Sequence, residues 1–286
     1  MNKQIRKVIY YIEEHLDDEF NVIQLAKVAG YSQFHFCRVF KTNMNESVMS
    51  YITRLRLERA SSQLISNNKS MIDAALDAGY QTPTGFLKAF KKRFGTTPTD
   101  YKKYTQILFD KSENSEMKNV EIITREKAYV VFTRAHGDYM TSSDIAWTRL
   151  SDNMNDLGEA FKKRPPNQEL YLGKGNGEAI GICHDDPDIT EETNIRYDAA
   201  LAWGEKEIEV LADYGFETKT IASGKYAKTT YMGTYEDGEK AWNGLYGWIE
   251  KNNYKLRDEP AFEKYVNGFE ETDAIKILTE IYVPVV

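Results

Sequence analysis

The chain has 286 residues, of which 41 % are hydrophobic, enough for two domains with separate cores. No apolar run approaches the ~20 residues that cross a bilayer, and the first residues lack the pattern of a signal peptide, so we expect a cytoplasmic protein with no membrane partner. Cys37 and Cys183 have no partner spacing and the four histidines are scattered. This argues against a disulfide framework, a metal site and a cofactor.

The charge is divided unevenly along the chain. Residues 1–105 contain 16 basic and 10 acidic residues, a net charge of +6, whereas the remainder contains 21 and 34, a net charge of −13. The pI near 5.3 of the whole chain hides this difference. A basic first part indicates a polyanionic partner.

Short motifs occur twice in the first hundred residues, about 50 residues apart. The first copy reads Leu25-Ala26, Gly30-Tyr31 and Arg38-Val39-Phe40-Lys41, and the second reads Ala74-Ala75, Gly79-Tyr80 and Lys88-Ala89-Phe90-Lys91. Each copy predicts a helix, a turn at the glycine and a second helix, which is a helix-turn-helix unit. We expect the helices to start at Asn21, Ser32 and Thr82-Pro83, because these residues are typical of helix N-termini.

Residues 47–65 connect the two copies and carry apolar residues near helical spacing. A helix of this length measures about 28 Å. One turn of DNA measures about 34 Å, so the connecting helix is suited to hold two reading helices one turn apart.

Residues 4–104 resemble the DNA-binding domain of the AraC/XylS transcription regulators. The resemblance rests on both glycine turns, on Arg54-Leu55, Ala60 and Leu64 in the connecting helix, and on Phe86, Phe90-Lys91, Gly95, Pro98 and Tyr101. Asn45 stands where the family usually has glycine, and asparagine tolerates the left-handed conformation better than most residues.

The resemblance implies that the outer face of the second helix in each unit enters the major groove of double-stranded DNA. The positions on these faces, with the basic residues beside them that suit phosphates, are Gln33, Phe34, Cys37, Arg38, Lys41, Thr84, Leu87, Lys88, Lys91, Lys92 and Arg93. Arg38 and Lys88 can pair with guanine, and contact with phosphates or simple solvation is the alternative.

We expect three parts: a DNA-binding domain at 1–108, a polar linker at 109–117 and an effector-binding domain at 118–286. The third part also contains a repeat, in which Tyr129–Thr133, Gly137 and Trp147 are matched by Tyr226–Thr230, Gly233 and Trp242. Two further strands follow each helix. The predicted fold is an all-α double helix-turn-helix domain followed by an α+β domain of two pseudo-twofold-related strand-helix-strand-strand units.

Residues 118–286 resemble the GyrI-like effector-binding domain. His136–Tyr139, Asp185-Asp186-Pro187, Arg196–Asp198 and Glu280–Pro284 carry the resemblance. It implies a groove at the pseudo-twofold axis that binds bulky aromatic compounds, many of them cationic. The candidate ligand-binding residues are Glu280, Tyr282, Tyr139, Tyr197, Tyr235 and Trp242, with ordinary core packing as the alternative for each aromatic residue.

Glu280 is the expected charge partner of such an effector. In the closing strand, Ile281 and Val283 form the apolar face, so alternation sends Glu280 and Tyr282 to the other side. The competing interpretation is an ion pair with a nearby basic residue. For Asp198 we expect a structural ion pair with Arg196, two residues earlier on the same strand.

The leading hypothesis is a DNA-binding transcription regulator controlled by a small effector, which serves multidrug sensing and has RNA polymerase as a further partner. One alternative is a small-molecule hydrolase that uses Glu280 and a tyrosine. Another is a regulator whose second domain binds a protein. The sequence contains no Ser-His-Asp spacing, phosphate loop or metal cluster, and we therefore expect no enzyme activity.

Overall fold

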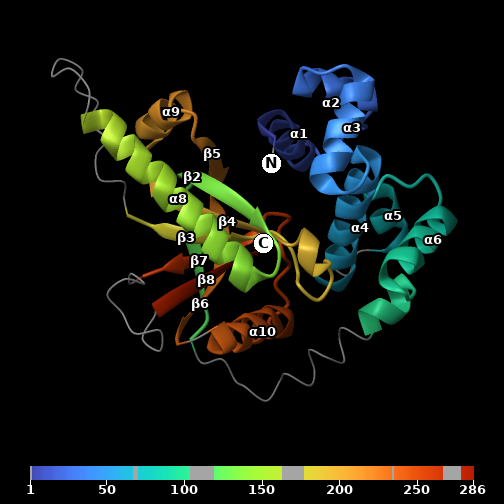
Figure 1. The fold of residues 1–286 in the computed structure, drawn as a ribbon. Helices are drawn as coiled ribbons and strands as arrows, with labels where there is room; N and C mark the ends of the chain where they lie inside the picture. Colours follow the sequence, from blue (N-terminus) through green and yellow to red (C-terminus); the bar gives the residue numbers. More distant parts are fainter. Residues whose placement is uncertain (1, 67–69, 104–118, 163–176, 234, 267–277) are drawn as a thin grey trace. The chain divides into compact units, whose positions relative to one another are not determined.

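The computed structural model describes residues 2–66, 70–103, 119–162, 177–233, 235–266 and 278–286, and the side chains of 62, 65–66, 159–162 and 235–237 lie outside the description. The chain forms two compact units, Met1–Ile107 and Leu108–Val286 (Figure 1). The expected linker at 109–117 lies outside the described residues. Within these ranges no helix is both long and apolar enough to cross a membrane.

The first unit is entirely helical in its described part. Its helices are α1 (Lys3–Glu14), α2 (Val22–Ala29), α3 (Gln33–Met44), α4 (Val48–Ser66), α5 (Met71–Asp77) and α6 (Pro83–Phe94). The side chain of Asn21 accepts a hydrogen bond from the Gln24 amide, and Thr82 accepts one from the Gly85 amide, so both expected N-caps are confirmed. Ser32 is an N-cap without such a bond. Asn45 ends α3 with φ 57°, a left-handed conformation that asparagine tolerates better than most residues.

Helix α4 takes part in two hydrophobic cores. Its first half contributes Val48, Tyr51, Ile52 and Leu55 to the core of α1, α2 and α3. Its second half contributes Leu57, Ala60 and Leu64 to the core of α5 and α6. The connecting helix is therefore the element that the two helix-turn-helix units share, as the repeat predicts.

The second unit contains an antiparallel sheet that is curled and has eight strands in its described part. The strands are β1 (Glu121–Arg125), β2 (Ala128–His136), β3 (Ala179–Cys183), β4 (Arg196–Trp203), β5 (Glu217–Ile221), β6 (Gly224–Met232), β7 (Ala261–Tyr265) and β8 (Leu278–Pro284). Their order is β1-β6-β8-β7-β3-β4-β2-β5. The helical elements are α8 (Tyr139–Lys162), the short η1 (Glu192–Asn194), α9 (Glu205–Asp213) and α10 (Tyr235–Lys251).

The two strand-helix-strand-strand units are confirmed as β2-α8-β3-β4 and β6-α10-β7-β8 (Figure 1). The edge strands β1 and β5 were not predicted. Each precedes one unit in the chain but pairs with the first strand of the other unit, β1 with β6 and β5 with β2. These short, polar strands therefore interlock the two halves, which their sequences alone do not indicate.

Strands β3 and β7 meet at the centre of the sheet, where Gly181 lies opposite Glu263. Ala199 of β4 and Ile281 of β8 extend this row on either side. Directly opposed residues project to the same face of a sheet. Because Ala199 packs under α8 and Ile281 packs under α10, both helices cover the face to which Glu263 belongs.

Candidate functional site

Helix α3 presents the surface that the sequence predicts for DNA. Phe36 and Phe40 are fully buried and hold the helix on its core, whereas Phe34 at its first turn is 84 % exposed. The other predicted members of this surface, Gln33, Cys37, Arg38 and Lys41, are also exposed. Neither Arg38 nor Lys41 has an acidic partner among the described residues, so both charges are available to an anionic ligand.

Helix α6 repeats this arrangement in the second helix-turn-helix unit. Phe86 and Phe90 are buried, and Thr84, Lys88, Lys91 and Lys92 are exposed, while Leu87 is half-buried. The three lysines have no ion pair within the described ranges. Arg93 differs from the expectation, because its guanidinium turns inward and pairs with the buried carboxylate of Glu58 at 2.9 Å.

In the second unit, hydrogen bonds converge on the carboxylate of Glu263. Trp242 Nε1 donates to its Oε1 at 2.8 Å, and Tyr265 Oη donates to its Oε2 at 2.8 Å. The Tyr265 and Tyr197 hydroxyls lie 2.9 Å apart, and Trp147 Nε1 donates to Tyr197 Oη at 3.0 Å. These hydrogen bonds can therefore all point in one direction, from Trp147 to Glu263. In such a series each hydrogen bond polarises and strengthens the next.

The glycine opposite Glu263 makes this convergence possible. A Cβ atom at Gly181 would lie 2.2 Å from Tyr197 Oη and 2.7 Å from Tyr265 Oη. Any larger residue would therefore displace the two hydroxyls. The aromatic rings around them are in contact as well: Trp147 lies edge-on to Tyr265, Tyr139 lies edge-on to Tyr197, and Trp242 stacks with Tyr246.

The side chains of Glu263, Tyr265 and Tyr197 are largely removed from water, but Glu263 is not fully enclosed. Burial raises the pKa of Glu263, and the hydrogen bonds from Trp242 and Tyr265 only partly oppose the shift. Burial also raises the pKa of Tyr265 and Tyr197, so both hydroxyls stay protonated and can donate at neutral pH. Glu263 nevertheless keeps some exposed surface, and it has no basic partner in the part of the chain that the structure describes.

Glu280 lies on the opposite face of the sheet. Ile281 and Val283 are buried toward α10, as predicted. Lys228 Nζ lies 2.7 Å from Glu280 Oε1, and Tyr282 Oη donates to Oε2 at 2.6 Å. Partial burial alone would raise the pKa of Glu280, but these two neighbours lower it below the ordinary value. The contacts thus match the competing interpretation of Glu280 as an ion-paired residue.

The predicted ligand residues therefore divide into two groups. Trp242 contacts Glu263 directly, Tyr197 is linked to it through Tyr265, and Tyr139 packs on Tyr197. Glu280 lies across the sheet with Tyr282, whose ring contacts Phe262 and Arg125. The side chain of Tyr235 lies outside the description. Glu263 and Tyr265 were not among the predicted ligand residues, although they repeat the Glu-x-Tyr spacing of Glu280 and Tyr282.

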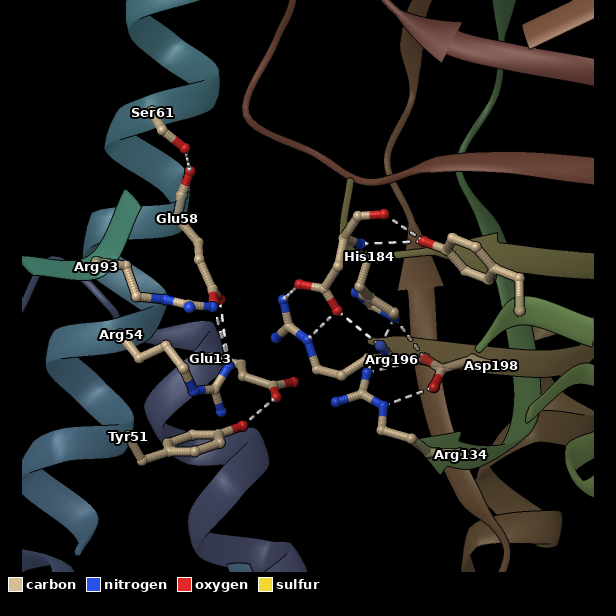
Figure 2. Close-up of polar contacts among 12 residues, drawn as sticks. Glu13, Tyr51, Arg54, Glu58, Ser61, Arg93, Arg134, His184, Arg196 and Asp198 are labelled. Carbon is tan, nitrogen blue, oxygen red and sulfur yellow. Dashed lines mark hydrogen bonds and ion pairs between the residues drawn. The ribbon is translucent and has the colours of Figure 1, made fainter. Parts of the chain in front are cut away.

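A separate buried network surrounds Asp198 (Figure 2). Arg134 holds this carboxylate with two nitrogens at 2.6 and 2.9 Å, and Lys219 and His184 contact it too. The expected pair with Arg196 was wrong. Arg134 stands directly opposite Asp198 on the neighbouring strand, while Arg196 reaches back to Asp185. Burial lowers the pKa of His184 to about 4, so it is neutral at pH 7.

Comparison with known proteins matches both units. The family of the GyrI-like small molecule binding domain matches residues 118–286, and a helix-turn-helix domain family matches residues 25–104. Regulatory protein SoxS of Escherichia coli is 34 % identical over 100 residues, which are 35 % of this chain and 94 % of SoxS. Right origin-binding protein of the same organism is 32 % identical over 99 residues, 35 % of this chain and 34 % of that protein. The structure of a hydrolase from Listeria innocua is 11 % identical with a TM-score of 0.43, and the match covers 62 % of this chain and 96 % of the hydrolase.

We predict that Asp198→Asn lowers the free energy of unfolding of the second unit by about 3–5 kcal/mol at neutral pH, because basic groups stay buried beside an uncharged amide. Burial would raise the pKa of Asp198, but Arg134 and Lys219 hold it well below 3.8. A carboxylate with a lowered folded pKa stabilises the fold above its unfolded pKa, and this contribution is lost as the pH falls toward the folded value.

Urea unfolding followed by tryptophan fluorescence measures the free energy of unfolding from neutral to acid pH. The difference in this free energy between wild type and Asp198→Asn should become smaller below about pH 4. Asp152→Asn, a change at an exposed position of α8, is the control and should have little effect at any pH. A difference that stays constant down to the acid limit would contradict the charged state assigned to Asp198.

Proposed function

The chain belongs to the AraC-type DNA-binding transcription regulators and carries a GyrI-like small molecule binding domain, and on this basis we propose that an aromatic cation bound beside Glu263 controls how the first unit binds DNA. We also propose that this regulator acts in the cytoplasm, on chromosomal DNA and with RNA polymerase as a partner.

The carboxylate of Glu263 is the observation that carries the proposal. A desolvated carboxylate without a cation is costly, and hydrogen bonds from Trp242 and Tyr265 offset this only in part. A bound cation supplies the missing charge. The rings of Trp147, Trp242 and Tyr246 can add cation–π contacts worth about 0.5–2 kcal/mol each. Recognition by charge and aromatic surface accepts several ligand shapes, which suits multidrug sensing.

A second candidate function is hydrolysis of an electrophilic small molecule. The observation in its favour is that Tyr265 Oη donates directly to a Glu263 carboxylate with a raised pKa, an acid and base within hydrogen-bonding distance. This activity requires turnover, so the protein should be incubated with an aromatic ester such as 1-naphthyl acetate, whose ester bond water cleaves to 1-naphthol and acetate, and the mixture analysed by chromatography. Release of 1-naphthol no faster than in buffer or with Glu263→Gln excludes hydrolysis of that ester at this site.

For the DNA-binding surface, we expect Arg38→Ala to weaken specific binding by about 1–3 kcal/mol and to relax the preference at one base position. Lys92→Ala should weaken binding equally on all sequences and lower the salt slope by about one unit, because a phosphate contact releases counterions. Selection from randomised DNA followed by fluorescence anisotropy at several salt concentrations measures both effects. Unchanged affinity and preference in Arg38→Ala would show that α3 reads DNA through another face.

For the ligand site, we expect 1-methylquinolinium to bind the full-length wild type more tightly than its neutral isostere 1-methylnaphthalene. Glu263→Gln should remove this preference, at a cost of about 1.5–3 kcal/mol in cation binding, because the charged partner is lost. Quenching of tryptophan fluorescence measures the affinities. Cation binding should also strengthen as the pH rises through the pKa of Glu263, since only the ionised carboxylate attracts the cation.

Glu280→Gln is the matched control, because Glu280 also stands two residues before a tyrosine that donates to it. It should leave the preference for the cation unchanged. Loss of the preference in Glu280→Gln but not in Glu263→Gln would return the site to the residue that the sequence predicted. Equal affinity of the wild type for both compounds would contradict the proposal for either carboxylate.

A further inference from the structure

Helix α4 buries a carboxylate between the two helix-turn-helix units. Glu58 is only 6 % exposed, and among the described residues it pairs with Arg54 and Arg93. Its Oε2 lies 3.2 Å from Arg54 Nη1 on the same helix, and its Oε1 lies 2.9 Å from Arg93 Nη2 in the last turn of α6 (Figure 2).

The polar contacts continue from Arg54 into the first helix-turn-helix unit and to α1. Arg54 donates from Nε and Nη2 to Glu46, which lies just before α4, and its guanidinium lies 5.1 Å from the centre of the Tyr51 ring. Tyr51 Oη donates to Glu13 of α1 at 2.8 Å. A continuous series of contacts therefore runs from α1 along α4 to α6, as Figure 2 shows for its labelled members.

Between α4 and α6, apolar side chains also pack together, among them Leu57, Phe86 and Phe90. Apolar burial is non-directional and permits small rotations and shifts of one helix on another. An ion pair with hydrogen-bonding geometry is directional. A buried ion pair is weak evidence for stability, and in some proteins buried polar or ionic groups select one arrangement of the helices.

We propose that Glu58 is a positioning residue for DNA recognition: by holding Arg93, it fixes α6 on α4 and so sets the spacing between the reading surfaces of α3 and α6. Glu58 does not contact DNA in this account. Its effect is on the number of base pairs between the two DNA segments that the protein reads.

The competing role for Arg93 is a direct phosphate contact, which its place beside Lys91 and Lys92 predicts from the sequence. The two roles differ in what a substitution changes. Loss of a phosphate contact lowers the salt slope by about one unit and leaves the preferred spacing intact. Loss of a positioning contact leaves the salt slope intact and weakens the discrimination between spacings.

The experiment uses the full-length protein and a DNA sequence selected by the wild type from a randomised pool. Footprinting locates the two contacted segments, and one base pair is inserted between them, which turns the segments by about 35° relative to each other. The wild type should lose affinity by about 30-fold or more on the inserted DNA, comparable to one or two mismatched base pairs.

In Arg93→Met, which keeps the aliphatic stem and leaves Glu58 paired with Arg54, this penalty should fall below about fivefold with an unchanged salt slope. Glu58→Gln should give the same result. Asp17→Asn is the matched control, because it breaks the ion pair of Asp17 with Arg59 of α4 without touching α6, and it should keep the wild-type penalty.

Circular dichroism of each variant records whether the helices remain folded. A full spacing penalty in Arg93→Met overturns the proposal, and so does a lower salt slope, which would identify Arg93 as a phosphate contact. A wild type that tolerates the insertion also overturns it. Loss of helical signal in Arg93→Met would assign the ion pair to stability alone and would equally contradict a positioning role.

Discussion

A carboxylate at the centre of the second unit has hydrogen-bond donors on both oxygens but no counter-charge among the described residues. Trp242 and Tyr265 supply the donors, and Gly181 leaves the space in which the tyrosine hydroxyls meet. The antiparallel pairing of β3 with β7 sets this geometry, because it places Gly181 opposite Glu263 under the two covering helices. The arrangement of the aromatic cluster and the expected ligand charge both depend on how this one group is accommodated.

The first unit contains a carboxylate whose charge is neutralised by basic side chains. Glu58 is also buried, but two arginines neutralise it, so it is suited to hold helices in place and not to attract a ligand. The exposed basic residues of α3 and α6 have no such partners within the described ranges, which leaves them available to DNA. The difference between paired and unpaired charges thus separates structural residues from candidate binding residues in both units.

Much of the fold followed from the sequence, because both units are internal repeats and repeated motifs fix helix starts, turns and the shared helix α4. Asn45 shows how far this extends: the family resemblance puts it at a position usually held by glycine, asparagine tolerates the left-handed conformation, and its φ is 57°. The edge strands β1 and β5 were missed because short polar strands carry little periodicity. The ligand acid proposed here, Glu263, differs from Glu280, the residue that the sequence favours, for a related reason. Alternation correctly put Glu280 on the face opposite Ile281, but which face the helices cover depends on pairing across strands, and in Phe262–Tyr265 each face carries both an aromatic and a charged residue.

The central claim is that ligand binding at Glu263 and DNA binding by the first unit are linked, and a single pair of titrations tests it. Saturating 1-methylquinolinium should change the affinity for the selected DNA by a factor within about 5–150, and the same DNA should change the affinity for the cation by the same factor. Glu263→Gln should abolish both changes and leave DNA binding without ligand intact. A cation that binds the wild type while DNA affinity stays the same would contradict the account.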